Sequence, residues 1–304
     1  MLENHTWGEL TSQVLALYAR PMRRPATARK MRQVLLEFGD LVGKASDLTP
    51  ALVARWIAAH PNRRPETVCA LLRSLRAACV YGVQAKLLDT SPFDFREPSA
   101  WVDWDVEELD PPVHQAEEIA RVLALADQEA SGGSWKAARL RALVYCYAFT
   151  GARKREVLAL QTADIDLAAG VLQIRTNRRC GLKTRQSAAC LPLPAPLGAV
   201  LAAWLPRTES EWLFPGIRRK GPWLEGPPGE KPLDQVKALG LRTGVPGLTL
   251  QSFRHTFASL SESWGIGELA LQRVLRHSNL RTQRAYRHEL PEVLRDVAAK
   301  VHFP

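Results

Sequence analysis

A proline-rich, acidic stretch divides the 304-residue chain into two parts. The segment 87–112, LLDTSPFDFREPSAWVDWDVEELDPP, holds four prolines among many carboxylates. Proline lacks a backbone donor and disfavours helix in the residue before it, so this stretch cannot continue a helix. The sequence before it shows helical periodicity, whereas the sequence after it mixes helix and strand patterns. We therefore expect two domains, residues 1–98 and 114–304, joined by a linker at 99–113.

The first domain has the pattern of a small helical bundle. Apolar residues recur at helical spacing in four segments, at 7–19, 26–43, 49–60 and 65–84. Thr49 is the expected N-cap of the third helix, with Pro50 in its first position. In the fourth helix, arginines occupy one face and Leu, Ala and Val the other, as expected when one face packs on a core.

The second domain combines helices with a β-hairpin. Two helical segments, 114–130 and 136–150, come first. The apolar runs GVLQIRT and SAACLPL then flank the basic turn 177–186, which indicates a hairpin with a basic tip. Residues 246–265 are expected to form a capped helix closed by Gly265, with helix from there to the end. The predicted fold is mainly α with a small β-sheet: a helical bundle followed by an α+β domain.

The charge of the chain favours a polyanionic partner. The formal net charge is +10 and the pI is near 9.7. Nucleic acid is the commonest polyanion, and an anionic membrane surface is the alternative. No segment is apolar over the length that spans a bilayer, and no long basic helix with bulky apolar anchors is evident. Because MLENHTWGEL also lacks a signal-peptide pattern, we expect a cytoplasmic protein.

The cysteines favour neither a disulfide framework nor a metal site. Their number is odd and no C-x-x-C pair occurs. We expect reduced, mostly buried thiols at Cys69, Cys79, Cys146, Cys180 and Cys190. The sequence also shows no P-loop and no cluster of metal ligands.

Two motifs of the second domain present cations. In TGARKREVLAL, residues 150–160, a Thr-Gly turn is expected to start a helix whose first turn presents Arg153. Glu156 lies three residues on, on the same face, and is able to hold that guanidinium. Lys183 lies on the expected hairpin. Taken singly, these residues also fit a solvated ion pair and an exposed turn lysine.

Two further motifs add histidines and a phenol. In LTLQSFRHTF, Gln251 and Arg254 share a helical face at i, i+3, with His255 beside them. LQRVLRHSNLRTQRAYRHEL, residues 271–290, places His277 and Tyr286 among five arginines. Taken singly, the arginines and histidines also fit a basic surface helix, and Tyr286 also fits a half-buried packing residue. The order Arg, Lys, Arg-His, His, Tyr in a basic chain favours a functional site.

In combination, these motifs resemble the tyrosine recombinases, also called phage-type integrases. The family pattern T-G-x-R-x-x-E-x-x-x-L is matched by Thr150, Gly151, Arg153, Glu156 and Leu160. A hairpin lysine ahead of a PLP-like strand end is matched by Lys183 and by residues 191–194. The pattern H-x-x-R-H-[ST]-F-A is matched by Gln251, Arg254, His255, Thr256, Phe257 and Ala258. The pattern L-G-H-x-x-x-x-T-x-x-Y is matched by Leu275, His277, Thr282 and Tyr286, with nine residues from histidine to tyrosine.

Two positions depart from these patterns. Gln251 stands where the family has a histidine, and Arg276 where it has a glycine. Glutamine donates a hydrogen bond to a phosphate oxygen but takes no proton near neutral pH. If the family histidine is a general base, then His255 or His277 covers that role here, or the reaction is slower.

The resemblance implies transfer of a DNA phosphodiester to Tyr286 with no metal, ATP or other cofactor, which agrees with the lack of a P-loop and of a metal-ligand cluster in the sequence. Arg153 and Arg254 would clamp the non-bridging oxygens, and cations around the phenol favour its ionised form. Lys183 would protonate the leaving 5′-oxygen. His277 and Gln251 would donate to the phosphate, whereas Glu156 would orient Arg153. Such enzymes act as homotetramers on paired double-stranded DNA sites.

The first domain is similar to the core-binding module of this family, and its charges suggest phosphate contacts. Together with the hairpin tip, the expected DNA-binding residues are Arg23, Arg24, Arg29, Lys30, Arg63, Arg64, Arg178, Arg179 and Arg185. The tail 291–304 either docks on a neighbouring copy or caps its own core. Two other functions stay open. A type IB topoisomerase, which relaxes DNA, shares the Arg, Lys, Arg, His, Tyr set, although the TG-x-R motif and the two-domain layout favour the recombinase. A non-catalytic DNA-binding protein derived from a recombinase is supported by Gln251.

Overall fold

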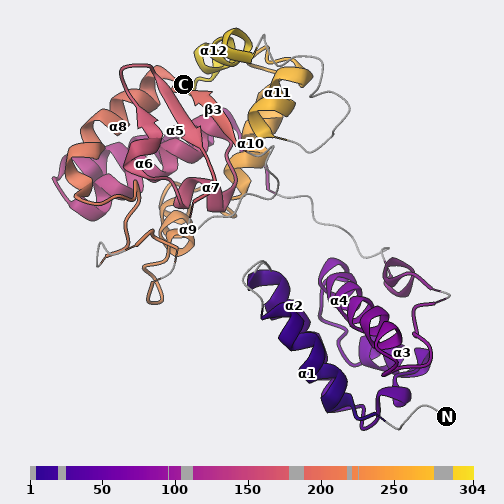
Figure 1. Ribbon diagram of the computed structural model, residues 1–304. Helices are drawn as coiled ribbons and strands as arrows, with labels where there is room; N and C mark the ends of the chain where they lie inside the picture. The colour runs from indigo at the N-terminus through magenta and orange to yellow at the C-terminus, as the bar shows by residue number, and fades with distance from the viewer. Residues whose placement is uncertain are drawn as a thin grey trace. The chain divides into compact units, whose positions relative to one another are not determined.

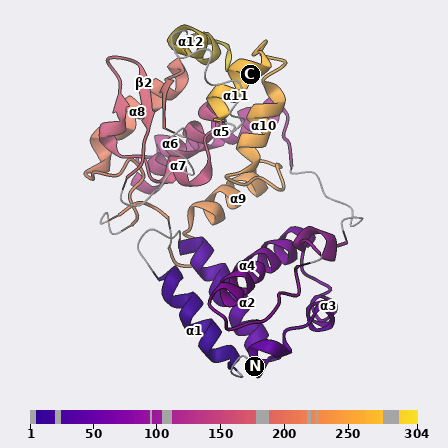
Figure 2. The same ribbon diagram turned by 45° about the vertical axis from the view of Figure 1, so that its right-hand side comes forward.

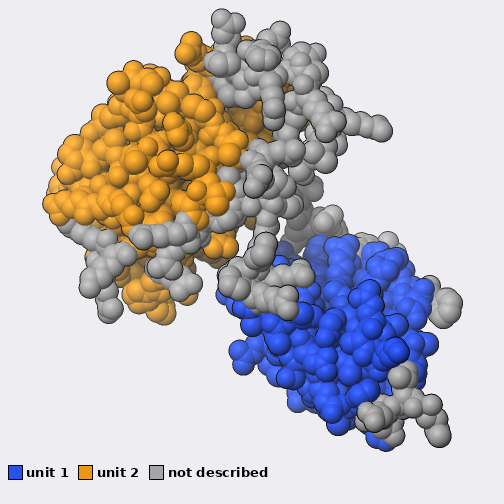
Figure 3. Space-filling model, viewed as in Figure 1, with its two compact units in different colours: residues 1–109 blue, residues 110–304 orange. Residues whose placement is uncertain are grey.

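A computed structural model describes residues 5–19, 25–94, 96–103, 112–177, 188–217, 221–224, 226–276 and 290–304. The chain forms two compact units, Met1–Leu109 and Asp110–Pro304 (Figure 3). The point of division lies within the segment 99–113 that the sequence suggests as a linker. Within the described part of the chain, no helix combines the length and apolarity needed to cross a membrane.

The first unit is a helical bundle whose helices begin at residues suited to capping. The elements are α1 (Trp7–Tyr18), α2 (Pro25–Gly39), η1 (Ala45–Asp47), α3 (Pro50–Ala58), α4 (Pro65–Gln84) and η2 (Pro98–Trp101). The Thr49 hydroxyl accepts a hydrogen bond from Leu52 N (3.3 Å) ahead of Pro50, which confirms the predicted cap. α4 packs on α2 and α1 around buried Phe38, Trp56 and Leu72. η2 also packs against α4.

The second unit is built round one helix that is buried on all sides. The helices are α5 (Ala116–Ser131), α6 (Trp135–Thr150), α7 (Lys154–Leu158), η3 (Thr162–Asp164), α8 (Ala195–Thr208), α9 (Pro232–Arg242), α10 (Ser252–Leu260), α11 (Glu268–Leu275) and α12 (Leu290–Lys300). Nearly every residue of α6 from 138 to 150 is buried, because α5, α8, α9 and α10 pack around it (Figures 1 and 2). α6 therefore anchors the turn that follows it, where the site begins.

A three-stranded antiparallel sheet lies beside these helices. Its strands are β1 (Ile165–Asp166), β2 (Val171–Ile174) and β3 (Ala189–Pro192), in the order β1-β2-β3. Val171 pairs with Pro192 and Ile174 with Ala189, so β2 and β3 are the two strands of the predicted hairpin. Leu172 and Leu191 face each other across the strands and are both buried. The fold is thus mainly α with a small β-sheet, as predicted.

The end of the chain packs on its own unit. α12 contacts β3 and α11, and Val297 and Val301 are buried (Figure 1). The Phe303 ring contacts the rings of Phe149 (5.2 Å between centroids) and Trp264 (5.5 Å). Of the two roles the sequence left open for the tail, this structure has the one in which it covers its own core.

Two boundaries differ from the sequence predictions. α10 ends at Leu260 rather than at Gly265, because residues 261–265 form a turn that closes at the left-handed Gly265 (φ +67°). The chain is also not helical to its end: α12 stops at Lys300, and the last residues extend along the core.

Candidate active site

The Thr-Gly motif forms a sharp turn between α6 and α7. The Thr150 hydroxyl donates to Cys146 O and accepts from Ala152 N (3.2 Å). Gly151 then takes a left-handed conformation (φ +55°) that closes α6. A Cβ on Gly151 would lie 2.9 Å from side-chain atoms of Leu275 and Phe257, so only glycine fits without displacement. This close approach brings the ends of α6 and α11 together with α10.

Arg153 is the N-cap of α7 rather than part of its first turn. Its backbone is extended (φ −70°, ψ 150°), and α7 starts at Lys154, so the predicted placement is wrong by one residue. The Glu156 carboxylate accepts from Arg153 N (2.9 Å) and from Arg153 Nη1 (3.0 Å). The predicted orientation of Arg153 by Glu156 is therefore present, and the carboxylate also caps Arg153 N as in one half of a capping box.

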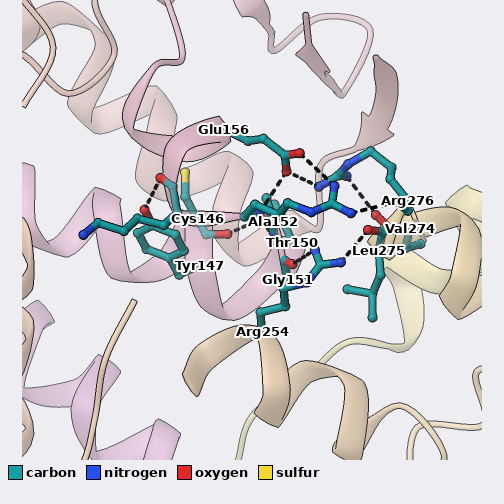
Figure 4. A network of polar contacts seen from close by, with 12 residues as sticks. Cys146, Tyr147, Thr150, Gly151, Ala152, Glu156, Arg254, Val274, Leu275 and Arg276 are labelled. Atoms are coloured by element: carbon teal, nitrogen blue, oxygen red, sulfur yellow. Dashed lines mark hydrogen bonds and ion pairs between the residues drawn. The ribbon is translucent and has the colours of Figure 1, made fainter. Parts of the chain in front are cut away.

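Arg254 extends from α10 to the ends of two other helices. Its Nη1 donates to Gly151 O (2.8 Å) and its Nη2 to Leu275 O (2.6 Å) (Figure 4). The two carbonyls are last-turn acceptors that the helices α6 and α11 leave unpaired. The guanidinium is thereby fixed at the same turns that surround Arg153.

Arg276 completes the network, although no role for it was predicted from the sequence. It ends α11 in a left-handed conformation (φ 55°, ψ 47°) and is buried. Its Nη2 donates to Glu156 Oε2 (2.6 Å) and its Nη1 to Val274 O (2.8 Å) (Figure 4). Its own carbonyl accepts from Arg153 Nη2 (2.9 Å). The departure from glycine at this position was the only sequence signal for it.

Three guanidiniums thus lie around one carboxylate, which pairs with two of them, Arg153 and Arg276. The cluster keeps a surplus of two positive charges. Burial by itself raises the pKa of Glu156, but the Arg276 charge and the hydrogen bonds from Arg153 outweigh it, and the net pKa is lowered. Burial, then repulsion from Arg153 and Arg276, lowers the pKa of Arg254 to about 10. Arg254 therefore stays protonated at neutral pH. A buried cluster with surplus cations is suited to an anion that brings its own negative charge.

Gln251 and His255 form a second polar pair at the start of α10. Gln251 is the N-cap, and its Nε2 lies 3.3 Å from His255 Nε2. Whether the ring donates or accepts depends on its tautomer. The pair sits on the helix that carries Arg254.

Most of the remaining predicted catalytic and hairpin residues lie outside the described part of the chain. These are Lys183, His277, Tyr286, Arg178, Arg179 and Arg185. Arg23 and Arg24 of the first unit also lie outside it. Their roles stay predictions. The structure does bring together Arg153, Glu156 and Arg254, which come from sequence segments about a hundred residues apart.

The described basic residues of the first unit differ in exposure and in whether an ion pair holds them. Arg29 and Lys30 on α2 and Arg64 ahead of α4 are exposed. Arg63 instead pairs with Glu37 through two bonds of 2.7 and 2.9 Å, and its guanidinium lies 5.4 Å from the Trp56 ring centroid. Contact with DNA stays a prediction for all four.

Comparison with known proteins places the chain in a family. The model of the phage integrase family matches residues 113–292, more than half of the chain. The tyrosine recombinase XerD of Rhizobium meliloti is 28% identical over 191 residues, which cover 61% of this chain and 60% of that protein. The chain spans between 55% and 60% of the length of the curated relatives it matches. The chain therefore belongs to the phage integrase family of tyrosine recombinases.

Solved structures of integrases share its fold. The Tn1549 transposon integrase in complex with transposon right end DNA has a TM-score of 0.67 and 18% identity, covering 90% of this chain and 92% of that one. A lambda integrase tetramer bound to a Holliday junction has a TM-score of 0.65 and 15% identity, covering 92% of this chain and 80% of that one. At such identities the likeness shows the fold alone.

Proposed function

We propose that the chain is a site-specific DNA recombinase that cleaves and rejoins DNA through a 3′-phosphotyrosine at Tyr286. The observation that carries this proposal is the cluster of Arg153, Arg254 and Arg276 around Glu156, in a chain of the phage integrase family. The guanidiniums are held by the backbone carbonyls of two turns and by one carboxylate. Such fixed donors need no rearrangement when charge develops on a bound phosphate.

Each step of the proposed reaction uses a group of this chain. The ionised Tyr286 oxygen attacks the scissile phosphorus, forming a P–O bond to tyrosine while the bond to the 5′-oxygen breaks. Arg153 and Arg254 stabilise the charge on the non-bridging oxygens. Lys183 gives a proton to the leaving 5′-oxygen, and His277 and Gln251 donate to the phosphate. Since one phosphodiester replaces another, attack by a 5′-hydroxyl reverses the step and rejoins DNA.

The partners follow from the same chemistry. The proposed substrate is double-stranded DNA, which suits the net charge of +10, and the proposed location is the cytoplasm. Assembly into a homotetramer on paired sites is proposed by analogy with the lambda integrase tetramer. Exposed Arg29, Lys30 and Arg64 are proposed phosphate contacts of the first unit.

The test is formation of a covalent adduct. Nicked duplexes from the DNA flanking the gene, selected for tight and salt-sensitive binding, are incubated with wild-type protein and with Tyr286→Phe. Denaturing gels are expected to show an adduct with the wild type and none with the variant.

Other outcomes would favour the alternative functions. Tight binding without an adduct would favour a non-catalytic DNA-binding protein, and Gln251→His would then be tested for rescue of cleavage. Relaxation of a supercoiled plasmid without recombinant products would favour a topoisomerase.

A further inference from the structure

Arg276 has a backbone conformation that disfavours any residue except glycine. Among the described residues, three that are not glycine have positive φ: Lys86 (58°), Glu209 (45°) and Arg276 (55°). Lys86 and Glu209 are exposed, whereas Arg276 is buried. Its Nε is buried and has no hydrogen-bond partner within the part of the chain that the structure describes. Strain, burial of a charge and an unpaired donor all oppose folding, and glycine at this position would avoid all three.

The contacts of Arg276 converge on Arg153. Through its carbonyl, residue 276 holds Arg153 Nη2 directly (2.9 Å). Through its guanidinium, it holds Glu156 Oε2 (2.6 Å), while the other oxygen of the same carboxylate pairs with Arg153 Nη1 (3.0 Å). The neighbouring carbonyl of Leu275 holds Arg254. One turn at the end of α11 therefore orients both proposed phosphate ligands.

The charge of Arg276 also matters for the bound phosphate. Without it, Glu156 would neutralise Arg153 and would repel an approaching phosphate. With it, the carboxylate is shared by two guanidiniums whose side chains differ in exposure, 32% for Arg153 and 3% for Arg276. The more exposed guanidinium is then free to compensate the phosphate, while the buried one compensates Glu156.

We propose that Arg276 is a positioning residue that holds Glu156 and Arg153 and neutralises the carboxylate, so that Arg153 and Arg254 present surplus positive charge to the scissile phosphate. This inference rests on the proposed function. Because Arg276 is buried, it acts through Glu156 and Arg153 rather than on the DNA itself.

The experiment compares Arg276→Gly and Arg276→Lys with the wild type in single-turnover adduct formation on the selected nicked duplex. With glycine, we expect the cleavage rate to fall by about 100-fold, the loss typical of one preorganised charge-stabilising group. Affinity for the uncleaved duplex should change by less than about threefold, since Arg276 makes no exposed phosphate contact. Lysine keeps the charge but cannot bridge Glu156 and Val274 O in the same way, so it should restore only part of the rate.

Three readouts separate positioning from a structural role. The urea midpoint of Arg276→Gly should not fall, because the loss of an ion pair is offset by relief of strain and of charge burial. The groups that surround Glu156 are Arg153, Arg254, Arg276 and the Tyr147 phenol. Removing Arg276 takes away the largest cause that lowers the pKa of Glu156, so this pKa should rise and the acid limb of cleavage should move to higher pH. Adding Glu156→Gln to Arg276→Gly should cost less than the two single losses combined.

Lys86→Gly is the matched control. It relieves the same backbone conformation at an exposed site in the other unit, and cleavage should stay at the wild-type rate. Wild-type cleavage by Arg276→Gly with an unmoved acid limb would overturn the inference alone. A parallel loss of cleavage and urea midpoint would reduce Arg276 to a structural role. Absence of an adduct with wild-type protein would overturn the proposed function, and the inference with it.

Discussion

Each unit contains an arginine–glutamate ion pair in a basic region, and the two pairs leave different amounts of positive charge. In the first unit, Glu37 takes both terminal nitrogens of Arg63, and the side chains are 22% and 25% exposed. In the second, Glu156 is divided between Arg153 and Arg276, with Arg254 close enough to feel the charge of both. The first pair is neutral, whereas the second region keeps a surplus of two positive charges.

The comparison shows that residue type alone does not mark a phosphate ligand. The sequence suggested both Arg63 and Arg153 for contact with DNA. The two arginines differ in two ways. Among the described residues, the carboxylate next to Arg63 has one cation, whereas the carboxylate next to Arg153 has several, and backbone carbonyls fix the orientation of the guanidiniums only in the second region. A one-to-one pair uses its donors on its own carboxylate, and a shared carboxylate leaves donors for a ligand.

Removing one arginine from each region should give the largest difference between the two regions in effect on DNA cleavage and binding. Arg254→Ala is expected to slow adduct formation by about 10³-fold, since a charged, fixed donor to the phosphate is lost. Arg63→Ala should reduce affinity for the same duplex by no more than about fivefold, because its guanidinium is already paired. Single-turnover cleavage and fluorescence anisotropy measure the two effects. A loss of cleavage with Arg63→Ala that matched Arg254→Ala would remove the distinction between the regions.

Neutralising the carboxylate of each region should give the next largest difference, in the free energy of unfolding of the two units. Glu156→Gln leaves two guanidiniums uncompensated in a buried network, which is expected to destabilise the second unit by about 3 kcal/mol. Glu37→Gln breaks a partly exposed pair and should cost the first unit about 1 kcal/mol. Urea unfolding followed by hydrogen exchange assigns each loss to its unit. Equal losses would contradict the difference in burial.

The pH dependence of stability provides a control for the effect of Glu156→Gln. The pKa of Glu156 in the folded protein lies below its ordinary value of about 4.3. Its contribution to stability is therefore present above that ordinary value and lost as the pH falls through the lower, folded-state pKa. The stability difference between wild type and Glu156→Gln should shrink below about pH 4.3 and stay constant from pH 5 to 8.

The smallest expected effect is on the salt dependence of DNA binding, which should differ between exposed and ion-paired arginines of the first unit. Arg29→Ala should reduce the slope of log affinity against log salt by about one, as for one lost phosphate contact. Arg63→Ala should leave that slope close to the wild-type value. Binding titrations across a series of salt concentrations measure both slopes. A slope change for Arg63 as large as that for Arg29 would show that the ion pair opens on DNA.

Local signals were sufficient for much of the fold. The Thr49–Pro50 pair predicted the start of α3, and the two apolar runs predicted β2 and β3, because caps and alternation are written in neighbouring residues. The spacing of Arg153 and Glu156 predicted their contact. The end of α10 was misplaced because Gly265 marked a later turn, beyond a helix that had already ended at Leu260.

Contacts between distant segments could not be predicted in this way. Arg276 meets Glu156 across 120 residues, and nothing near either residue indicates the other. Arg63, in the turn before α4, likewise meets Glu37 on α2. The placement of Arg254 depends on the close approach of α11 and α10 to Gly151. The Thr-Gly turn does not indicate this approach, because the meeting of α6 and α11 is seen only in the fold.

The central claim is that the Arg153–Arg254 cluster compensates the charge of the scissile phosphate. It is tested most directly by replacing one non-bridging oxygen of that phosphate with a methyl group, which removes its negative charge. Cleavage of the normal and the modified nicked duplex is then compared for wild type and Arg254→Ala. We predict that the loss of about 10³-fold on the phosphodiester shrinks to about tenfold or less on the neutral substrate. Equal losses on the two substrates would contradict the account.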